Sequence, residues 1–242
     1  MDTRWSIYID IEGFGALYEK DNAVLRALGD LMDGIYLIGT TCYTEMSSRI
    51  FAHQTGDGFA IVSEFGAESL ETPVAIAIAL LRHVASSGRF AKAAIAEGAF
   101  ADITGCYPKR VRDSQDKCGR VIMNGGFMTL FPVMGPALIN AFQLSKVSPS
   151  GALLALAAAN SARLPDGCVV HTITERELIA IDWVHSSLPL VAKLQQKAGL
   201  RSPDVSALKS GFHAYFHASG VKEEWKANTA WYLSLGVLTD HA

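Results

Sequence analysis

The stretch WSIYIDIEGFG, residues 5–15, alternates apolar and polar side chains as far as Asp10 and then runs into two glycines. Strict alternation with a period of two is typical of a β-strand that has one buried face. The glycines end the strand, and the apolar spacing that follows over residues 16–32 predicts a helix. A strand that carries an aspartate near its end and passes directly into a glycine turn therefore begins the fold.

Two further short strands are predicted at residues 50–55 and 59–65, on either side of Gly56-Asp57-Gly58. An Asp-Gly pair between apolar runs is a strong signal for a tight hairpin turn. Taken alone, such a turn is more often structural than functional. If the hairpin lies beside the first strand, however, Asp57 emerges at the same end of the sheet as Asp10.

The rest of the chain alternates between helical and extended patterns. Helices are expected at residues 72–86 and 135–146, and strands at 92–100, 120–124, 127–131, 169–173 and 178–183. This order predicts an α+β fold with a ferredoxin-like antiparallel sheet and helices on one face. Further helices are expected near residues 188–199, 203–218 and 221–235. They predict a helical C-terminal extension over residues 188–242, after a main domain over residues 1–187.

Composition narrows the classes of partner. The chain has 242 residues, of which 50% are hydrophobic and 19% charged, and its formal net charge is −3. Its lysines and arginines are scattered, whereas nucleic-acid binders usually carry a basic patch, so DNA and RNA are disfavoured. The apolar runs at residues 73–81 and 152–159 are far shorter than the ~20 residues that span a membrane. A cytoplasmic protein is expected, since no secretory signal pattern opens the chain and its four cysteines form no zinc or disulfide motif.

Asp10 and Asp57 are the residues that indicate a chemical function. Two carboxylates that are brought close repel each other, which raises a pKa or recruits a cation. Oxygen-only ligands suit Mg²⁺ or Mn²⁺, which typically bind one or two carboxylates together with substrate phosphates. The glycine-flanked turn Gly13-Phe14-Gly15 lets backbone N–H groups approach a triphosphate. Together these features predict a metal-dependent nucleotide site.

The segments DIEGFG, residues 10–15, and TGDGFAIV, residues 55–62, resemble the metal-binding motifs of the class III nucleotidyl cyclases. The resemblance implies that Asp10 and Asp57, with the backbone carbonyl of Ile11, bind two divalent ions, Mn²⁺ or Mg²⁺. The segment KAAIAEG is similar to a further strand of the family, with Lys92 where arginine is usual. Residues 101–108, ADITGCYP, and 223–235, EEWKANTAWYLSL, are more narrowly similar to the pyrimidine cyclases of the Pycsar anti-phage system.

The chain departs from the family pattern in the helix expected over residues 135–146. Class III cyclases supply there an asparagine and an arginine that stabilise the transition state. In this chain Asn140 is one place away from the expected position, and Gln143 stands in place of the arginine. Arg110, with its neighbours Arg112 and Arg120, is a candidate to supply the missing charge, although a solvated basic loop is an equally good interpretation.

The positions that read the base also differ from those of adenylate cyclases. His53 replaces the lysine that reads adenine, four residues before the metal-binding Asp57, and Pro132 occupies the position of its partnering aspartate. The absence of this pair disfavours ATP and is compatible with a smaller pyrimidine base. It does not choose between uracil and cytosine.

The resemblance implies a homodimer with shared active sites that converts a pyrimidine nucleoside triphosphate into its 3′,5′-cyclic monophosphate and pyrophosphate. UTP is favoured over CTP because uridylate cyclases are the commoner kind in the family. The product, cUMP, would signal to a separate cyclic-nucleotide-binding effector in phage defence. Three alternatives stay open: a cytidylate cyclase, a purine cyclase in which His53 reads the base differently, and a nucleotide-binding sensor with no turnover.

Overall fold

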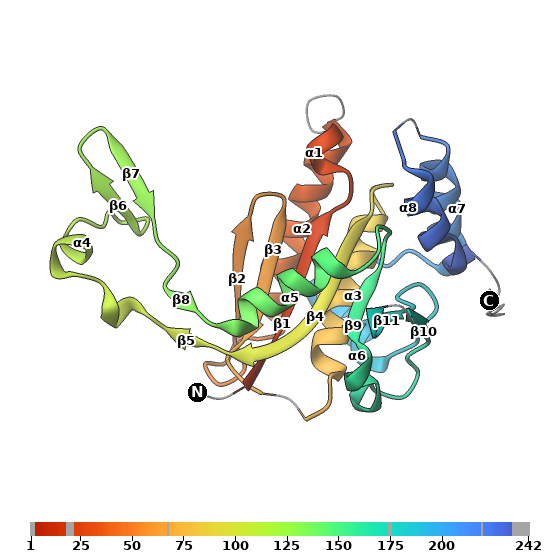
Figure 1. The fold of residues 1–242 in the computed structure, drawn as a ribbon, viewed down its shortest axis with the longest axis horizontal. Helices are drawn as coiled ribbons and strands as arrows, with labels where there is room; N and C mark the ends of the chain where they lie inside the picture. The colour runs from red at the N-terminus through yellow and green to blue at the C-terminus, as the bar shows by residue number, and fades with distance from the viewer. Residues whose placement is uncertain (1–2, 18–21, 67, 174–175, 219, 234–242) are drawn as a thin grey trace.

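The computed structural model of the chain describes residues 3–17, 22–66, 68–173, 176–218 and 220–233. A seven-stranded sheet runs through it in the order β10-β11-β9-β4-β1-β3-β2 (Figure 1). In chain order these strands are β1 (Thr3–Ile11), β2 (Ile50–Thr55), β3 (Gly58–Ser63), β4 (Ala91–Ala99), β9 (Leu154–Ala157), β10 (Val170–Ile173) and β11 (Leu178–Ile181).

The strand predicted from residues 5–11 lies at the centre of this sheet. β1 pairs antiparallel with both β3 and β4, and β2 closes the hairpin with β3. The resulting β4-β1-β3-β2 order is the ferredoxin-like part of the fold, and it confirms the α+β class. β9 was not predicted from the sequence. It pairs parallel with β4 and makes the sheet mixed.

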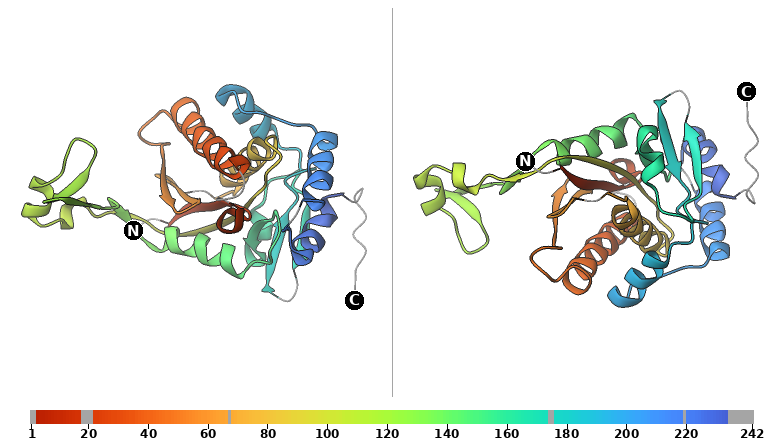
Figure 2. Two further views of the ribbon diagram at one scale, coloured as in Figure 1. Left: turned by 90° about the horizontal axis from the view of Figure 1, so that it is seen from above. Right: turned by 90° about the horizontal axis from the view of Figure 1, so that it is seen from below.

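Alternate residues of β1 point to opposite faces of the sheet. Ile7 and Ile9 belong to the main core, which is covered by α2 (Asn22–Thr41), α3 (Glu71–Ala85) and α6 (Pro189–Ala198). Tyr8 faces the other way, into a small cluster with Ala141 of α5 (Pro136–Val147). Figure 2 shows α5 on the opposite side of the sheet from α2 and α3. The expectation of helices on one face is therefore wrong for α5.

A close backbone contact explains this position of α5. A Cβ atom added to Gly98 of β4 would lie 2.5 Å from the backbone nitrogen of Ala137, so only glycine lets the helix come so near. The hydroxyl of Ser6, in β1, donates a hydrogen bond to the carbonyl of Ala137. The start of α5 is thus fixed over β1 and β4.

The N-terminal helix prediction, residues 16–32, is only partly matched. The short helix α1 (Phe14–Leu17) follows the glycine turn, residues 18–21 lie outside the described part of the chain, and α2 continues as far as Thr41. The predicted C-terminal helices correspond to α6, α7 (Val205–Phe216) and α8 (Glu223–Ala230), followed by the short helix η4 (Trp231–Leu233).

These C-terminal helices share the core of the sheet. Phe212 of α7 stacks on Phe90, with ring centroids 4.1 Å apart, and Trp225 of α8 lies in the same aromatic cluster. The domain boundary after residue 187 stays a prediction. None of the helices in the described ranges is both long and apolar enough to cross a membrane.

Residues 101–134 form an arm that projects from the sheet (Figure 1). It leaves and returns through the paired strands β5 (Ala101–Asp102) and β8 (Val133–Met134). The elements of the arm are η1 (Thr104–Cys106), α4 (Lys109–Asp113), β6 (Arg120–Met123) and β7 (Gly126–Thr129). Outside the arm, the short helix η2 (Ala158–Arg163) follows β9. The predicted strands at 120–124 and 127–131 are confirmed as the β6–β7 hairpin, although the hairpin is not part of the main sheet.

Candidate active site

The end of β1 brings the two predicted aspartates together. Asp10 pairs with Gly58 of β3 on one side and with Lys92 of β4 on the other. Asp57 directly precedes Gly58 in the β2–β3 turn, so both carboxylates lie at the same end of neighbouring strands. The sequence predicts this juxtaposition on the condition that the hairpin lies beside the first strand, and the pairing of β1 with β3 meets that condition.

The carboxyl group of Asp10 lies in an environment that disfavours its own negative charge. Burial, with the nearby charge of Asp57 as the second cause, raises the pKa of Asp10 to about 6, although Lys92 acts in the opposite direction. Its Oδ1 atom is buried and has no hydrogen-bond partner among the described residues. An unpartnered carboxylate oxygen beside a second carboxylate is suited to a cation.

Two more charged side chains complete this cluster. The Lys92 ammonium group donates a hydrogen bond to the carbonyl of Ser148, 3.1 Å away, and burial lowers its pKa while Glu12 and Asp10 raise it. Burial, followed by the charge of Asp10, raises the pKa of Glu12 to about 7. The end of β1 therefore gathers three carboxylates around one ammonium group, an excess of negative charge that favours cations.

The carboxylates fit a divalent ion that also binds substrate. No group of three or more histidine, cysteine, aspartate or glutamate side chains in the described ranges could hold a metal by itself. Mg²⁺ characteristically binds one or two carboxylates and completes its shell with water and phosphate oxygens. Asp10 and Asp57, with the carbonyl of Ile11 beside them, match that kind of site better than a closed protein cage.

Asp10→Asn is expected to stabilise the metal-free protein at neutral pH. Because the pKa of Asp10 is raised from 3.8 to about 6 in the folded state, that state retains a proton between about pH 4 and 6 that the unfolded chain has lost. Stability therefore falls as the pH rises through this range. The variant avoids the loss, so urea unfolding at pH 8 should show a gain of up to about 3 kcal/mol that disappears below pH 4.

The exposed Asp113 provides the control for this measurement. Asp113→Asn on α4 should change the free energy of unfolding by less than about 0.5 kcal/mol at either pH. A lower stability of Asp10→Asn at pH 8 would mean that attraction to Lys92 outweighs burial.

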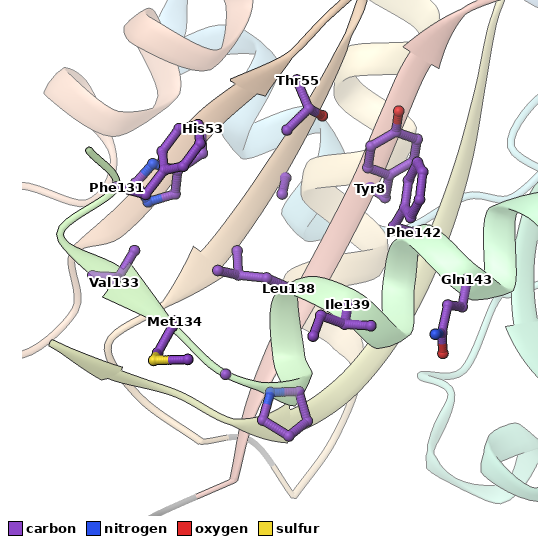
Figure 3. Close-up of a pocket in the computed structure, with 13 residues that line it drawn as sticks. Tyr8, His53, Thr55, Phe131, Val133, Met134, Leu138, Ile139, Phe142 and Gln143 are labelled. Carbon is purple, nitrogen blue, oxygen red and sulfur yellow. The ribbon is translucent and has the colours of Figure 1, made fainter. Parts of the chain in front are cut away.

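An apolar cavity of about 620 Å³ lies on the face of the sheet covered by α5, with Tyr8 and Thr55 in its lining (Figure 3). Its aromatic lining has edge-to-face contacts between Tyr8 and Phe142, with ring centroids 5.0 Å apart, and between His53 and Phe131, 5.3 Å apart. Burial lowers the pKa of His53, so its ring is neutral near pH 7. Its buried Nε2 has no hydrogen-bond partner in the described part of the chain, which leaves it available to a polar group of a ligand.

Tyr8 joins the cavity to the carboxylates. Burial, with the charge of Asp10 as the second cause, raises the pKa of Tyr8 to about 12, so the hydroxyl group stays protonated, and its side chain is hydrogen-bonded with Thr55. A Cβ atom at Gly58 would lie 2.4 Å from this hydroxyl oxygen and 3.1 Å from the Cβ of Asp10. Glycine at position 58 is therefore required for the close approach of both side chains.

The predicted phosphate-binding turn adjoins Asp10 directly. Gly13 has φ +74°, a conformation that favours glycine, and a Cβ atom at Gly15 would meet no atom of the described residues within 4 Å. Phe14 packs partly against the main core. Within the described ranges, nothing covers the turn on the side of Gly15, and phosphate binding by its backbone stays a prediction.

Asn140 and Arg110 are not brought to the aspartate pair of their own chain. The amide of Asn140 donates a hydrogen bond to the carbonyl of Glu97, 2.7 Å away. Glu97 pairs with Trp5, five residues along β1 from Asp10, a separation of roughly 16 Å at the rise of a strand. Arg110 lies on α4 in the arm, where its side chain is exposed.

Thr55, Glu12 and Trp225 were not predicted to take part in the site. Lys92 offered a signal in the sequence, because a lysine at the head of an apolar strand must find a partner when it is buried. Trp225 offered none: its indole donates a hydrogen bond to Glu12, 2.9 Å away, across 213 residues of sequence. A contact of that range cannot be read from local patterns.

No protein family matches the sequence, and no curated protein matches it. Among solved structures, the chain is similar to a bacterial light-regulated adenylyl cyclase, at 13% identity over 85% of this chain and 56% of that one, with a TM-score of 0.43. It is also similar to a class III adenylyl cyclase-like ATP-binding protein from Pseudomonas aeruginosa, at 14% identity over 80% of this chain and 40% of that one, with a TM-score of 0.39. The chain thus spans about half the length of the solved structures it matches.

Proposed function

We propose that the chain is a class III nucleotidyl cyclase that converts a pyrimidine nucleoside triphosphate, preferentially UTP, into its 3′,5′-cyclic monophosphate and pyrophosphate. The observation that carries the proposal is the aspartate pair. Asp10 and Asp57 lie at one end of neighbouring strands, and a buried oxygen of Asp10 has no hydrogen-bond partner among the described residues. Placed beside a glycine turn and an apolar cavity, this pair suits a metal-bound triphosphate attached to a base.

In the reaction, the ribose 3′-hydroxyl gives up its proton to water and its oxygen forms a bond to the α-phosphorus, while the bond from that phosphorus to the α–β bridging oxygen breaks and pyrophosphate leaves. Asp10, Asp57 and the carbonyl of Ile11 would hold the metal ions. When bound, Mn²⁺ or Mg²⁺ supplies charge neutralisation to the triphosphate and acidifies the hydroxyl group that attacks. The open turn at Gly13–Gly15 would present backbone N–H groups to the phosphates.

The cavity is the proposed place of the base. The neutral His53 has an unpartnered nitrogen, and the Tyr8 hydroxyl is protonated, so each can form a hydrogen bond with a polar edge. Pro132 follows Phe131 of the lining and offers no backbone N–H and no side-chain carboxylate. These residues support a pyrimidine rather than the adenine of ATP, and CTP remains the alternative to UTP.

We propose further that the enzyme works as a homodimer with shared sites. Large apolar side chains are exposed on the arm and beside the cavity, at Ile122, Met123, Phe127, Met134 and Ile139. Exposed large apolar side chains are typical of interaction surfaces, and a second copy of the chain would cover these. Arg110 lies away from its own Asp10, so any charge stabilisation from the arm would act in the partner's site.

The similarity of residues 101–108 and 223–235 to pyrimidine cyclases of the Pycsar system supports the proposed context. There the product would act as a second messenger in anti-phage defence and bind a separate effector. We propose a cytoplasmic location, which is consistent with that role.

A nucleotide sensor with no turnover is the second candidate. Gln143 stands where the family carries a catalytic arginine, and the side-chain amide of Asn140 is already bonded to Glu97. Such a protein would bind a nucleoside triphosphate at the same aspartates and release it unchanged.

Purified protein incubated with Mn²⁺ and each of the four nucleoside triphosphates is expected to form cUMP, and cCMP more slowly, with pyrophosphate in equal amount. Chromatography of the products gives the result. Formation of cAMP or cGMP alone would reject the pyrimidine assignment, while saturable binding without any product would favour the sensor. Sedimentation at the assay concentration tests the dimer, because full activity in a monomer contradicts shared sites.

A further inference from the structure

Helix α8 makes three polar contacts with segments that lie far from it in the sequence. The indole of Trp225 donates a hydrogen bond to the carboxylate of Glu12, 2.9 Å away. Asn228 donates to the carbonyl of Ser150 at 2.7 Å, and the hydroxyl of Thr229 accepts from the backbone N–H of Ala152 at 3.1 Å. α8 therefore touches both the turn after β1 and the loop that follows α5.

The first of these contacts fixes a peptide unit of the candidate metal site. The backbone N–H of Glu12 donates to the carbonyl of Phe90, 2.9 Å away, and the ring of Phe90 lies 6.0 Å from that of Trp225. Glu12 is thus held at its amide and at its carboxylate by one connected cluster. Because its amide shares a peptide plane with the carbonyl of Ile11, the same contacts set where that carbonyl points.

The other two contacts hold the loop that leads from the hydrogen-bond acceptor of Lys92, the positively charged side chain beside the carboxylates. Lys92, which pairs with Asp10 across the strands, donates to the carbonyl of Ser148 at the end of α5. The loop after Ser148 passes close under α8, since a Cβ atom at Gly151 would lie 3.2 Å from atoms of both Asn228 and Thr229. The position of the Lys92 acceptor thus depends on a loop that α8 anchors.

We propose that Trp225 is a positioning residue of the metal site, which acts through Glu12 to orient the Ile11 carbonyl beside Asp10. The inference rests on the proposed function in that it takes Asp10, Asp57 and Ile11 as metal ligands. Residues that hydrogen-bond around metal ligands typically change metal affinity 10–100-fold when they are replaced. The C-terminal helices, on this view, are part of the catalytic unit rather than a cover for the sheet.

Trp225→Phe keeps an aromatic ring in the cluster and removes the indole donor. Mn²⁺ titrated alone into the apoprotein and followed by electron paramagnetic resonance should show a Kd about 10-fold higher than that of the wild type. Trp5→Phe is the matched control: it removes another indole from the same core, on the same strand as Asp10, with no hydrogen bond to Glu12. The Kd of this control for Mn²⁺ should stay within about twofold of that of the wild type, even if its free energy of unfolding is lower.

Variants of Glu12 test the same link if Trp225→Phe fails to fold. Glu12→Ala should weaken Mn²⁺ binding as much as Trp225→Phe does, and the double variant should add nothing further. Glu12→Gln keeps an acceptor for the indole and should recover most of the affinity. Equal weakening by Glu12→Gln and Glu12→Ala would show that charge, not position, matters and would overturn the proposal.

The remaining outcomes are decisive as well. An unchanged Mn²⁺ affinity in both Trp225→Phe and Glu12→Ala, or an equal fall in Trp5→Phe, overturns the positioning role. Mn²⁺ binding that depends on Trp225, in a protein that forms no cyclic nucleotide, supports the positioning role and rejects only the turnover. If the wild-type protein binds no Mn²⁺ on its own, the positioning role is rejected, whereas the cyclase is judged separately by product formation in the presence of Mn²⁺ and nucleotide.

Discussion

Asp57→Asn is expected to lower the turnover of UTP by at least about 10³-fold while the metal-free protein melts at the same temperature or slightly higher. The loss follows because a metal bound to a phosphoryl group contributes several kcal/mol of charge stabilisation, and each 1.36 kcal/mol is a factor of ten in rate. The unchanged melting follows because the charge of Asp57 raises the pKa of Asp10, so its removal relieves repulsion in the folded state. Product chromatography and a thermal melt measure the two effects.

Gln54→Ala is the control for the hairpin. The amide of Gln54 donates to the carbonyl of Gly56 at 2.9 Å, so this variant disturbs the same turn without removing a carboxylate. It should keep turnover within about fivefold of the wild type, since a neutral exposed hydrogen bond contributes only ~1 kcal/mol. If Asp57→Asn retained activity, or Gln54→Ala lost as much, Asp57 would be a turn residue and not a metal ligand.

Gly58→Ala should cost both stability and activity. The added methyl group would stand 2.4 Å from the hydroxyl oxygen and 2.8 Å from Cζ of Tyr8, so the ring must move, and with it the boundary between the cavity and the carboxylates. Overpacking of this kind costs about 1–3 kcal/mol, which lowers the melting temperature of a chain of this size by roughly 3–10 °C. Turnover should fall at least tenfold, because Asp10 lies on the other side of the same contact.

Two companion variants separate this clash from a general effect of alanine. Tyr8→Phe combined with Gly58→Ala removes the nearest atom and should regain part of the stability. Gly29→Ala, in the middle of α2 where a Cβ atom meets nothing within 4 Å, should stabilise the protein by about 0.5–1 kcal/mol. A melting temperature of Gly58→Ala equal to that of the wild type would mean that Tyr8 relaxes freely.

Local patterns predicted the part of the fold that carries the aspartates. The strand over residues 5–11 and the Gly56-Asp57-Gly58 turn depend only on neighbours in sequence, and both are found in the structure, although β1 is buried on both faces and not on one. β9 escaped prediction because a four-residue apolar strand cannot be told from a helix segment by periodicity. The face on which α5 lies depends on the missing side chain of Gly98, a tertiary contact that no pattern records.

The candidate site also has one part that the sequence predicts and another that depends on the folded structure. The neighbourhood of Asp10 and Asp57 follows from strand order, so it was predictable, whereas the cavity requires α5 and the base of the arm to meet β1 and β2. The raised pKa of Asp10 depends on burial first, and burial is a property of the assembled sheet. Contacts such as the one between Glu12 and Trp225 belong wholly to that assembled state.

The hydrogen bond between Glu12 and Trp225 also has a consequence for the time at which the protein matures. The strand with Asp10 leaves the ribosome before Trp225, which lies 213 residues after Glu12. At 5–20 residues per second, that interval is roughly 10–40 s of synthesis. A nascent chain thus carries both aspartates well before α8 has been made, so the turn after β1 acquires its contact with Trp225 only late in synthesis.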